Sequence, residues 1–436
     1  MRTLIVNGVL IDGSGAPARA PVSVLIEDHL IEEVIDRWAP YYDTADVVVD
    51  ARGGFVIPGV INHHVHGLTR GPLMIVGEPP LSDARVVANL DRLLDEGVTT
   101  ALNVDGFPTV EDARTQSRFH PLRVEVTTLH TPTHLEWATH GPFPFGGVRP
   151  RHAWTVDEML DAGAICVGEA GPGCDAHWAD YSLLPQAIAE RGGHATMEQA
   201  RTFRLAAEIG DRSAAREALA PTGVAPEHLE SMLEVHEATI AWRDLAQQAL
   251  REAIDAGRAH AVPLLLHHTP GTFDLVREAA RESTQVVIAG HSNFQIFDPD
   301  DAARRARELR DAGALIDIMS GDAHSARQFH PTPAVTHRLL SEGLVDLVST
   351  DYAGGFWDPM LVMLERAHEA GAVSLEAAVR MVTQAPAEAL PKLAPRRGCI
   401  APGLVADIVV TERGRLGAVR EVLIAGRVVE RRRRLR

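Results

Sequence analysis

The middle of the chain alternates short apolar runs with longer segments rich in Ala, Arg, Glu and Leu. Apolar runs of this length are typical of buried strands, and the segments between them have helical composition. Eight such runs are found, at residues 56–61, 99–104, 123–129, 164–168, 262–266, 285–289, 314–319 and 344–349. This alternation predicts the α/β class and a (β/α)8 TIM barrel over residues 55–395, whose chemistry lies at the C-terminal ends of the strands.

A long segment interrupts this alternation between the fourth and fifth strands. It favours helices at 197–208, 226–234 and 239–256, and it is longer than one crossover helix requires. We therefore expect a helical insertion at about residues 175–260. Two interpretations stay open for it, a lid over the active site and a surface or subunit-contact elaboration.

The two ends of the chain have a different texture from the middle. Runs at 4–10, 22–28, 403–410 and 419–424 are short, rich in β-branched residues and broken by Gly and Asp turns. This pattern predicts β-strands at both ends, outside the alternating region.

Composition narrows the classes of function. The chain has 436 residues, a net charge of −17 and three cysteines. The negative charge argues against nucleic acid or an anionic membrane surface as a partner. No apolar run approaches the roughly 20 residues of a membrane span, and the first ten residues lack a secretory pattern. With few, scattered cysteines, the expectation is a cytoplasmic protein.

The first candidate for chemistry is His64-Val65-His66 at the end of the first strand of the predicted barrel. Side chains alternate along a strand, so residues two apart face the same side. The two imidazoles therefore point to one place, as a divalent metal requires. By the same alternation, His63 is expected to face outward.

Other strand ends carry residues of the same kind. Four histidines and two carboxylates at one face can hold two metal ions. Beyond the first strand they are Glu169, one of His267 and His268, His291, and Asp351. Alternation allows only one of the two adjacent histidines to face inward.

At this point the chain resembles the amidohydrolase superfamily, metal-dependent barrel hydrolases that include hydantoinases, dihydroorotases, enamidases and many deaminases. The matching features are Pro58-Gly59 before His64-x-His66-Gly67, the strand-five and strand-six histidines, and Thr350-Asp351. The resemblance implies a small β-sandwich domain formed by both termini, residues 1–54 and 396–436, beside the barrel at 55–395.

Two departures from the family pattern bear on the site. Asn62 stands where many relatives carry an aspartate that supports the ligands. Many relatives also bridge two metals with a carbamylated lysine on strand four, but the single lysine here, Lys392, lies beyond strand eight. Glu169 is the natural replacement, since a carboxylate can span two cations. The residues around Glu169 most resemble those of enamidase-like members.

The resemblance implies a ligand set and a mechanism. His64, His66 and Asp351 would hold one ion, His268 and His291 the other, with Glu169 and a hydroxide between them. The turn after His268 resembles the family's His-Thr-x-Gly pattern, so His268 is favoured over His267. Asp351 would also act in catalysis, taking the proton of the hydroxide and passing it to the leaving nitrogen.

The expected function is metal-dependent hydrolysis of an amide C–N bond, in a cyclic amide or lactam-type small molecule. Deamination at a single metal is the first alternative. Relatives of that kind place a glutamate shortly after the strand-five histidine, whereas Thr269 to Phe273 contains no acid. N-acyl deacetylation is the second alternative, and a non-catalytic barrel scaffold is a remote one.

Substrate, metal and assembly are less constrained. Zinc suits histidine and carboxylate ligands, and iron, manganese or cobalt also fit. A homo-oligomer, dimer or tetramer, is expected by analogy with the family. Candidate substrate-binding residues follow the strand ends and are Arg70, His134, Trp137, His324 and Tyr352.

Overall fold

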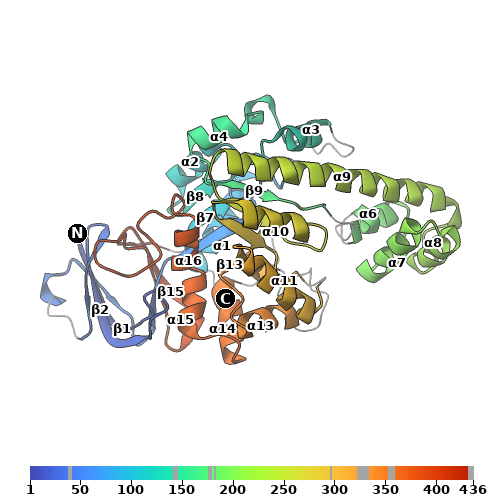
Figure 1. Ribbon diagram of the computed structural model, residues 1–436. Coiled ribbons are helices and arrows are strands. Elements are labelled where there is room, and N and C mark those ends of the chain that lie inside the picture. The colour runs from blue at the N-terminus through green and yellow to red at the C-terminus, as the bar shows by residue number, and fades with distance from the viewer. Residues whose placement is uncertain are drawn as a thin grey trace.

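The computed structural model describes residues 1–37, 42–140, 146–174, 179–180, 183–294, 297–321, 333–351 and 359–430 (Figure 1). The candidate residues His324 and Tyr352 lie outside these described residues. None of the helices in the described part of the chain is long and apolar enough to cross a membrane.

Strands from both ends of the chain form one mixed sheet. The N-terminal part supplies β1 (Arg2–Leu10), β2 (Arg19–Glu27), β3 (Leu30–Ile35), β4 (Val47–Asp50) and β5 (Phe55–Pro58), and the C-terminal part supplies β14 (Ile408–Glu412), β15 (Arg415–Ile424) and β16 (Arg427–Val428). The order is β16-β15-β14-β5-β1-β2-β3, with β4 paired to β1. The two parts meet where β14 runs antiparallel to β5. Apolar residues of both parts, such as Ile5, Val24 and Ile408, form a core of their own.

The middle of the chain forms two parallel sheets. One contains β6 (Val60–Val65), β7 (Val98–Asn103) and β8 (Arg123–Val126); the other contains β9 (Val167–Ala170), β10 (Leu264–His267), β11 (Val287–Gly290), β12 (Leu315–Met319) and β13 (Leu347–Ser349). A parallel bridge between Thr128 and Val167 links the sheets at one side. At the other side the backbone N–H of Asp351 donates to the carbonyl of His64 at 3.0 Å.

The structure divides the first predicted strand of the barrel into two. Phe55–Pro58 belongs to the mixed sheet, and Val60–Val65 to the parallel one. Gly59 lies between them, and a Cβ there would collide with Thr99. The mixed sheet therefore extends past residue 54, where we expected it to end.

Helices cover the outer side of the parallel strands. They are α1 (Asp83–Asp95), α2 (Val110–Phe119), α3 (Pro132–His140), α4 (Val156–Ala162), α10 (Phe273–Glu282), α11 (Pro299–Asp311), α13 (Ala334–Ser341), α14 (Met360–Glu369), α15 (Leu375–Met381) and α16 (Gln384–Ala389). Leu264 and Leu266 pack in the large cluster with these helices. Leu265, between them, packs in a second cluster with Ile61, Ile288 and Leu347 from other strands. Each strand thus has one face toward the helices and one toward its fellow strands.

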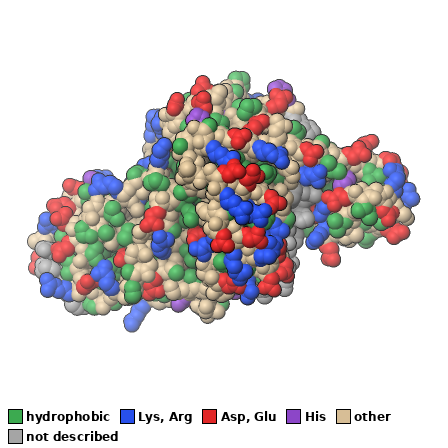
Figure 2. Space-filling view, in the orientation of Figure 1, with side chains coloured by type: hydrophobic (Ala, Val, Ile, Leu, Met, Phe, Trp, Pro, Cys, Tyr) green, Lys and Arg blue, Asp and Glu red, His purple; other side chains and the backbone are tan. Residues whose placement is uncertain are grey.

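The predicted helical insertion projects from the parallel strands as an arm (Figures 1 and 2). It comprises α6 (Leu183–Glu190), α7 (Met197–Glu208), α8 (Arg212–Leu219) and the first part of α9 (Leu229–Ala259). A Thr196–Gln199 capping box begins α7 at the residue predicted from the sequence. The arm has a separate apolar core that includes Phe203 and Met232. A buried ion pair of Arg204 with Asp180 also holds it together.

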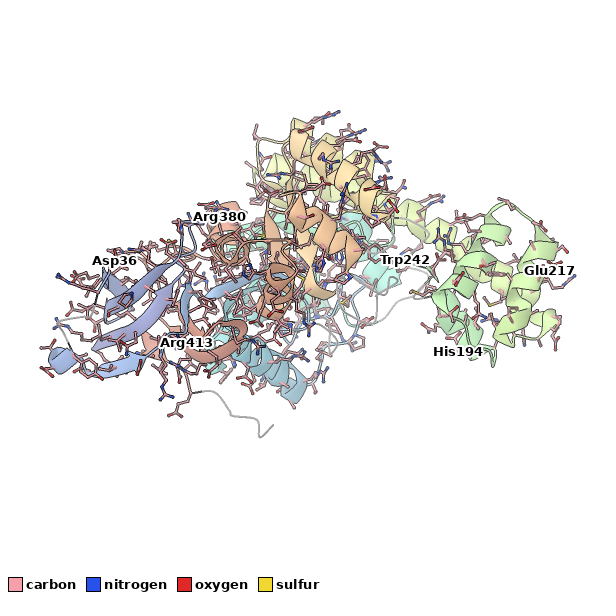
Figure 3. All side chains as sticks on the ribbon, turned by 90° about the horizontal axis from the view of Figure 1, so that it is seen from below. Asp36, His194, Glu217, Trp242, Arg380 and Arg413 are labelled. Carbon is pink, nitrogen blue, oxygen red and sulfur yellow. The ribbon has the colours of Figure 1, made fainter. Side chains whose placement is uncertain are left out.

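Helix α9 connects the arm to the rest of the molecule. It has 31 residues, about 46 Å of helix, and its C-terminal part packs beside α3 and β9. Trp242 of α9 lies at this junction, while Glu217 and His194 lie farther out (Figure 3). A Cβ on Gly173 would lie 2.7 Å from the Trp242 Nε1 atom. The segment that follows Glu169 is therefore packed directly against the helix of the arm.

Candidate metal centre

Two histidines of the first parallel strand lie at its C-terminal end. The side chains of His64 and His66 are buried, with ring centroids 5.8 Å apart. Neither ring nitrogen of His64 makes a hydrogen bond, although Nε2 lies 3.3 Å from a carboxylate oxygen of Glu169. A buried imidazole without a hydrogen-bond partner leaves a lone pair unsatisfied. A metal ion beside the carboxylate would satisfy it.

The carboxylate of Glu169, in β9, is where the histidines converge. Its Oε2 atom lies 3.3 Å from His64 Nε2 and 3.8 Å from His66 Nε2. Its Oε1 atom lies 3.1 Å from His291 Nε2 and 2.7 Å from His267 Nδ1. One unmodified carboxylate therefore faces rings from β6, from β10 and from the residue after β11.

Asp351 completes the cluster from the end of β13. Its Oδ1 atom lies 3.3 Å from His66 Nε2 and 3.5 Å from His64 Nε2, and its Oδ2 atom lies 3.6 Å from His291 Nε2. One potential ligand atom from each of His64, Glu169, His291 and Asp351 lies within 4.8 Å of all the others. Nitrogen and carboxylate donors at this spacing fit a divalent cation.

The pKa values of the cluster show how strongly its charges interact. Burial alone would raise the pKa of Glu169, but the nearby His64, His267 and His291 outweigh it and hold the pKa well below its usual value. Burial alone would lower the pKa of His66, but hydrogen bonds to Asp105 and Asp351 raise it to about 10. A protonated His66 ring thus stands beside the ionised carboxylate of Glu169. A metal ion would displace that proton, because ligands bind metals in their deprotonated form.

The structure corrects the choice between the two adjacent histidines of strand five. His267, not the favoured His268, lies beside Glu169, and its ring stacks on that of His291 with centroids 3.9 Å apart. His268 lies on the other face of the strand, 5.0 Å from the ring of Phe297. Burial, together with the nearby Arg305, lowers the pKa of His268 to about 3. The strand continues to His267, so this residue shares its face with Leu265 rather than with Leu266.

Asp105, after β7, is a site residue that sequence reasoning missed. One carboxylate oxygen lies 2.8 Å from Nδ1 of His66, and the other accepts the backbone N–H of Gly67 at 3.0 Å. A carboxylate on Nδ1 fixes the ring orientation and leaves Nε2 for a metal. The signal was available, because Asp105 directly follows the apolar run 99–104.

A second set of contacts lies beneath the cluster. The expectation that His63 faces outward is wrong. Its Nε2 atom lies 3.2 Å from Asp317, with both side chains fully buried, and Ser349 donates to the same carboxylate at 3.1 Å. The pairing of β6 with β7 shifts register between Asn62 and Val65, which breaks the simple alternation. Asn62 donates to Thr350 Oγ1 at 2.7 Å, so the residue that departs from the family pattern ties β6 to the residue before Asp351.

The candidate substrate-binding residues do not gather at the cluster. Arg70 forms an exposed ion pair with Asp83 at 3.0 Å. His134 and Trp137 are buried and stack on each other. Trp137 also makes an edge contact with Trp242, their centroids 3.9 Å apart. This places Trp137 in the packing between α3 and α9.

Comparison with known proteins places the chain in a family. Residues 195–429 match the family described as "Amidohydrolase family". The chain belongs to the amidohydrolase family. It is therefore a hydrolase of carbon–nitrogen bonds, in a family whose members act on small molecules and use metal ions.

Individual relatives are distant from this amidohydrolase. It is 38% identical over 66 residues to a dihydroorotase of Thermoanaerobacter sp. (strain X514), a match that spans 15% of this chain and 14% of the dihydroorotase. The β-aspartyl dipeptidase of Fervidobacterium islandicum AW-1 is similar in structure, with a TM-score of 0.56 and 14% identity over 98% of this chain and 96% of that one. An enamidase structure gives a TM-score of 0.54 and 16% identity over 100% and 97%. These structural likenesses extend over nearly the whole chain and imply a TIM barrel with an added β domain.

Proposed function

We propose that this amidohydrolase uses two divalent metal ions to cleave an amide C–N bond in a cyclic amide or lactam-type small molecule. The observation that carries the proposal is the convergence of His64, Glu169, His291 and Asp351 within 4.8 Å. His66 lies beside Asp351 at 3.3 Å, and His267 lies beside Glu169 at 2.7 Å. We also propose that the eight parallel strands close into a (β/α)8 barrel around this cluster.

The contacts suggest how the ligands would be shared. His64, His66 and Asp351 would hold one ion, His267 and His291 the second, and Glu169 would lie between them. When bound, such a pair would lower the pKa of a water molecule and polarise a substrate carbonyl. Zinc suits these donors, and iron, manganese or cobalt would also fit.

Asp351 has the position of the proton carrier in this proposal. One of its oxygens lies near His66 and the other near His291. It follows the C-terminal end of β13, the end at which the substrate of a barrel enzyme binds. A carboxylate there can accept a proton from the attacking water and give it to the leaving nitrogen. Opening of an amide ring needs this transfer, because an amide anion is a poor leaving group.

Hydrolytic deamination at a single metal is the main alternative. The segment after His267 argues against it, because Thr269 to Phe273 contains no carboxylate to carry a proton. Thr272 Oγ1 instead donates to the carbonyl of His267 at 2.6 Å and accepts from the N–H of Thr269. The turn thus serves to hold the end of β10. N-acyl deacetylation would use the same ligands, so only the substrate distinguishes it from the proposed cyclic-amide hydrolysis.

Metal content tests the proposal first. Protein purified without chelators or an affinity metal should contain about two ions per chain by elemental analysis. It should then hydrolyse at least one member of a panel of hydantoins, lactams and cyclic imides. About one ion per chain, with ammonia released from aminated heterocycles, would favour the deaminase. Hydrolysis of N-acyl amino acids alone would favour the deacetylase.

A further inference from the structure

His268 is a buried histidine for which the proposed ligand set has no use. Its side chain is fully buried on the helix-facing side of β10, between the rings of Phe273 and Phe297. The guanidinium of Arg305 lies over both of these phenylalanine rings. An imidazole is a costly way to fill an apolar pocket, since a leucine would fill it without a polar group to satisfy.

The ring makes its hydrogen bond through Nδ1, whereas Nε2 has no hydrogen-bond partner among the described residues. The Nδ1 atom of His268 lies 3.1 Å from the hydroxyl oxygen of Ser292. That hydroxyl donates its single hydrogen to the carbonyl of Ala289 at 2.9 Å. It must therefore accept from His268, so the neutral ring carries its proton on Nδ1.

The partners of this bond each stand next to a proposed ligand. His268 follows His267 at the end of β10, and Ser292 follows His291 after β11. The two strands are parallel neighbours, with His267 opposite Gly290. On the other face of this pair, the rings of His267 and His291 stack with 19° between their planes.

His291 also has a backbone that needs support. Its φ is +61°, in the left-handed region that a histidine seldom adopts, and such a residue is held by its surroundings. Ser292 supplies that support twice, through its hydroxyl to Ala289 and through its N–H to the carbonyl of Asp317 at 3.0 Å.

We propose that His268 is a positioning residue, which through Ser292 holds His267 and His291 at the spacing that the second metal ion requires. The bond lies on the face opposite the ligands, so it fixes the rotation of both strand ends without touching the ion. This inference rests on the metal centre of the proposed function. It adds that the second histidine of the His267-His268 pair acts on metal retention.

The test follows metal release rather than activity. Zinc-loaded protein is mixed with an excess of a chromogenic chelator, and the rate of zinc release is recorded. H268L keeps the pocket filled but removes the donor, and S292A removes the acceptor. H268N keeps a side-chain N–H at the position of Nδ1. F297L is the matched control, because it trims the same pocket and leaves the His268–Ser292 bond in place.

We expect H268L and S292A each to release one ion about 10- to 100-fold faster, with H268N and F297L within about threefold of the parent. The double variant H268L/S292A should be no faster than S292A alone, because H268L removes only a bond that S292A has already removed. Release from H268N as fast as from H268L would overturn the proposal. So would parental rates in H268L and S292A.

H267A separates failure of this inference from failure of the metal centre. If H267A speeds release and H268L does not, only the positioning role fails. If H267A also has the parental rate, the proposed metal centre is wrong and the positioning role falls with it. Melting temperatures of all variants, measured in parallel, show whether faster release follows from general destabilisation, which would appear in F297L as well.

Discussion

The Nδ1 atom of His66 lies 2.8 Å from a carboxylate oxygen of Asp105, a residue that follows the neighbouring strand β7. The same carboxylate accepts backbone N–H groups from Gly67 and Met74. Asp105 therefore fixes both the ring of His66 and the chain that follows it. We predict that D105N weakens metal binding about 10- to 100-fold, because an amide cannot accept at both positions.

A distant pair provides the control for that measurement. Asp91 lies 3.3 Å from His120, away from the cluster. D91N should leave the metal dissociation constant, measured by titration with Zn²⁺, within about threefold of the parent. Equal effects of D91N and D105N would contradict a specific role for Asp105.

The bridging position of Glu169 gives a second prediction. E169Q preserves the shape of the side chain but removes the charge that faces rings from three strand ends. We expect the metal content of the purified protein to fall from about two ions per chain to about one or fewer. Elemental analysis measures this directly. An unchanged content of two would show that Glu169 does not lie between the ions.

Asp351 is predicted to matter more for turnover than for metal. D351N retains an oxygen that can still coordinate, while it cannot accept a proton. The variant should keep most of its metal and lose nearly all of kcat, by about 100-fold or more. Steady-state kinetics on the best substrate of the panel, beside metal analysis, checks both parts. Full activity in D351N would exclude it as the proton carrier.

Acid should destabilise the protein through His134. Burial lowers the pKa of this histidine from its usual 6.5 to about 4. Between these values the unfolded chain binds a proton that the folded chain does not, so stability falls as the pH drops from 6.5 to 4. The full loss is about 3 kcal/mol from this residue.

Replacement of His134 should flatten that dependence. The free energy of unfolding, measured in urea, should change between pH 7.5 and pH 4.5 by about 2 to 3 kcal/mol less in H134N than in the parent. H140N, which removes an exposed histidine of the same helix, serves as the control. The same difference in the parent and in H134N would mean that His134 is protonated in the folded protein.

The sequence predicted much of the framework, because apolar runs ending in polar residues mark the ends of buried strands. Glu169 and His291 were found in this way, and they lie within the cluster. The sequence pattern does not show which residue is the last of a strand. The run 262–266 ends one residue before β10 does, and one residue of error exchanges the two faces of a strand. The strand end therefore did not decide between the two histidines, and the family-like turn after His268 favoured the one that lies outside the cluster.

Contacts between strands could not be predicted from the sequence, for a different reason. His63 meets Asp317, and Asn62 meets Thr350, across gaps of more than 250 residues. Such pairs depend on the register of neighbouring strands, and here a register shift in β6 turns His63 away from its expected face. No local pattern reports a shift of that kind.

The pairing of β5 with β14 has a consequence for how the protein is made. The ribosome synthesises β1 to β5 first, and it synthesises β14 near the end, before only β15 and β16. Throughout synthesis of the parallel strands and the arm, the edge of β5 has no partner to pair with. An unpaired edge is a template for aggregation. A truncated chain, or a chain whose release from the ribosome is delayed, would thus expose the edge of β5. This would happen even though the catalytic residues had already been synthesised.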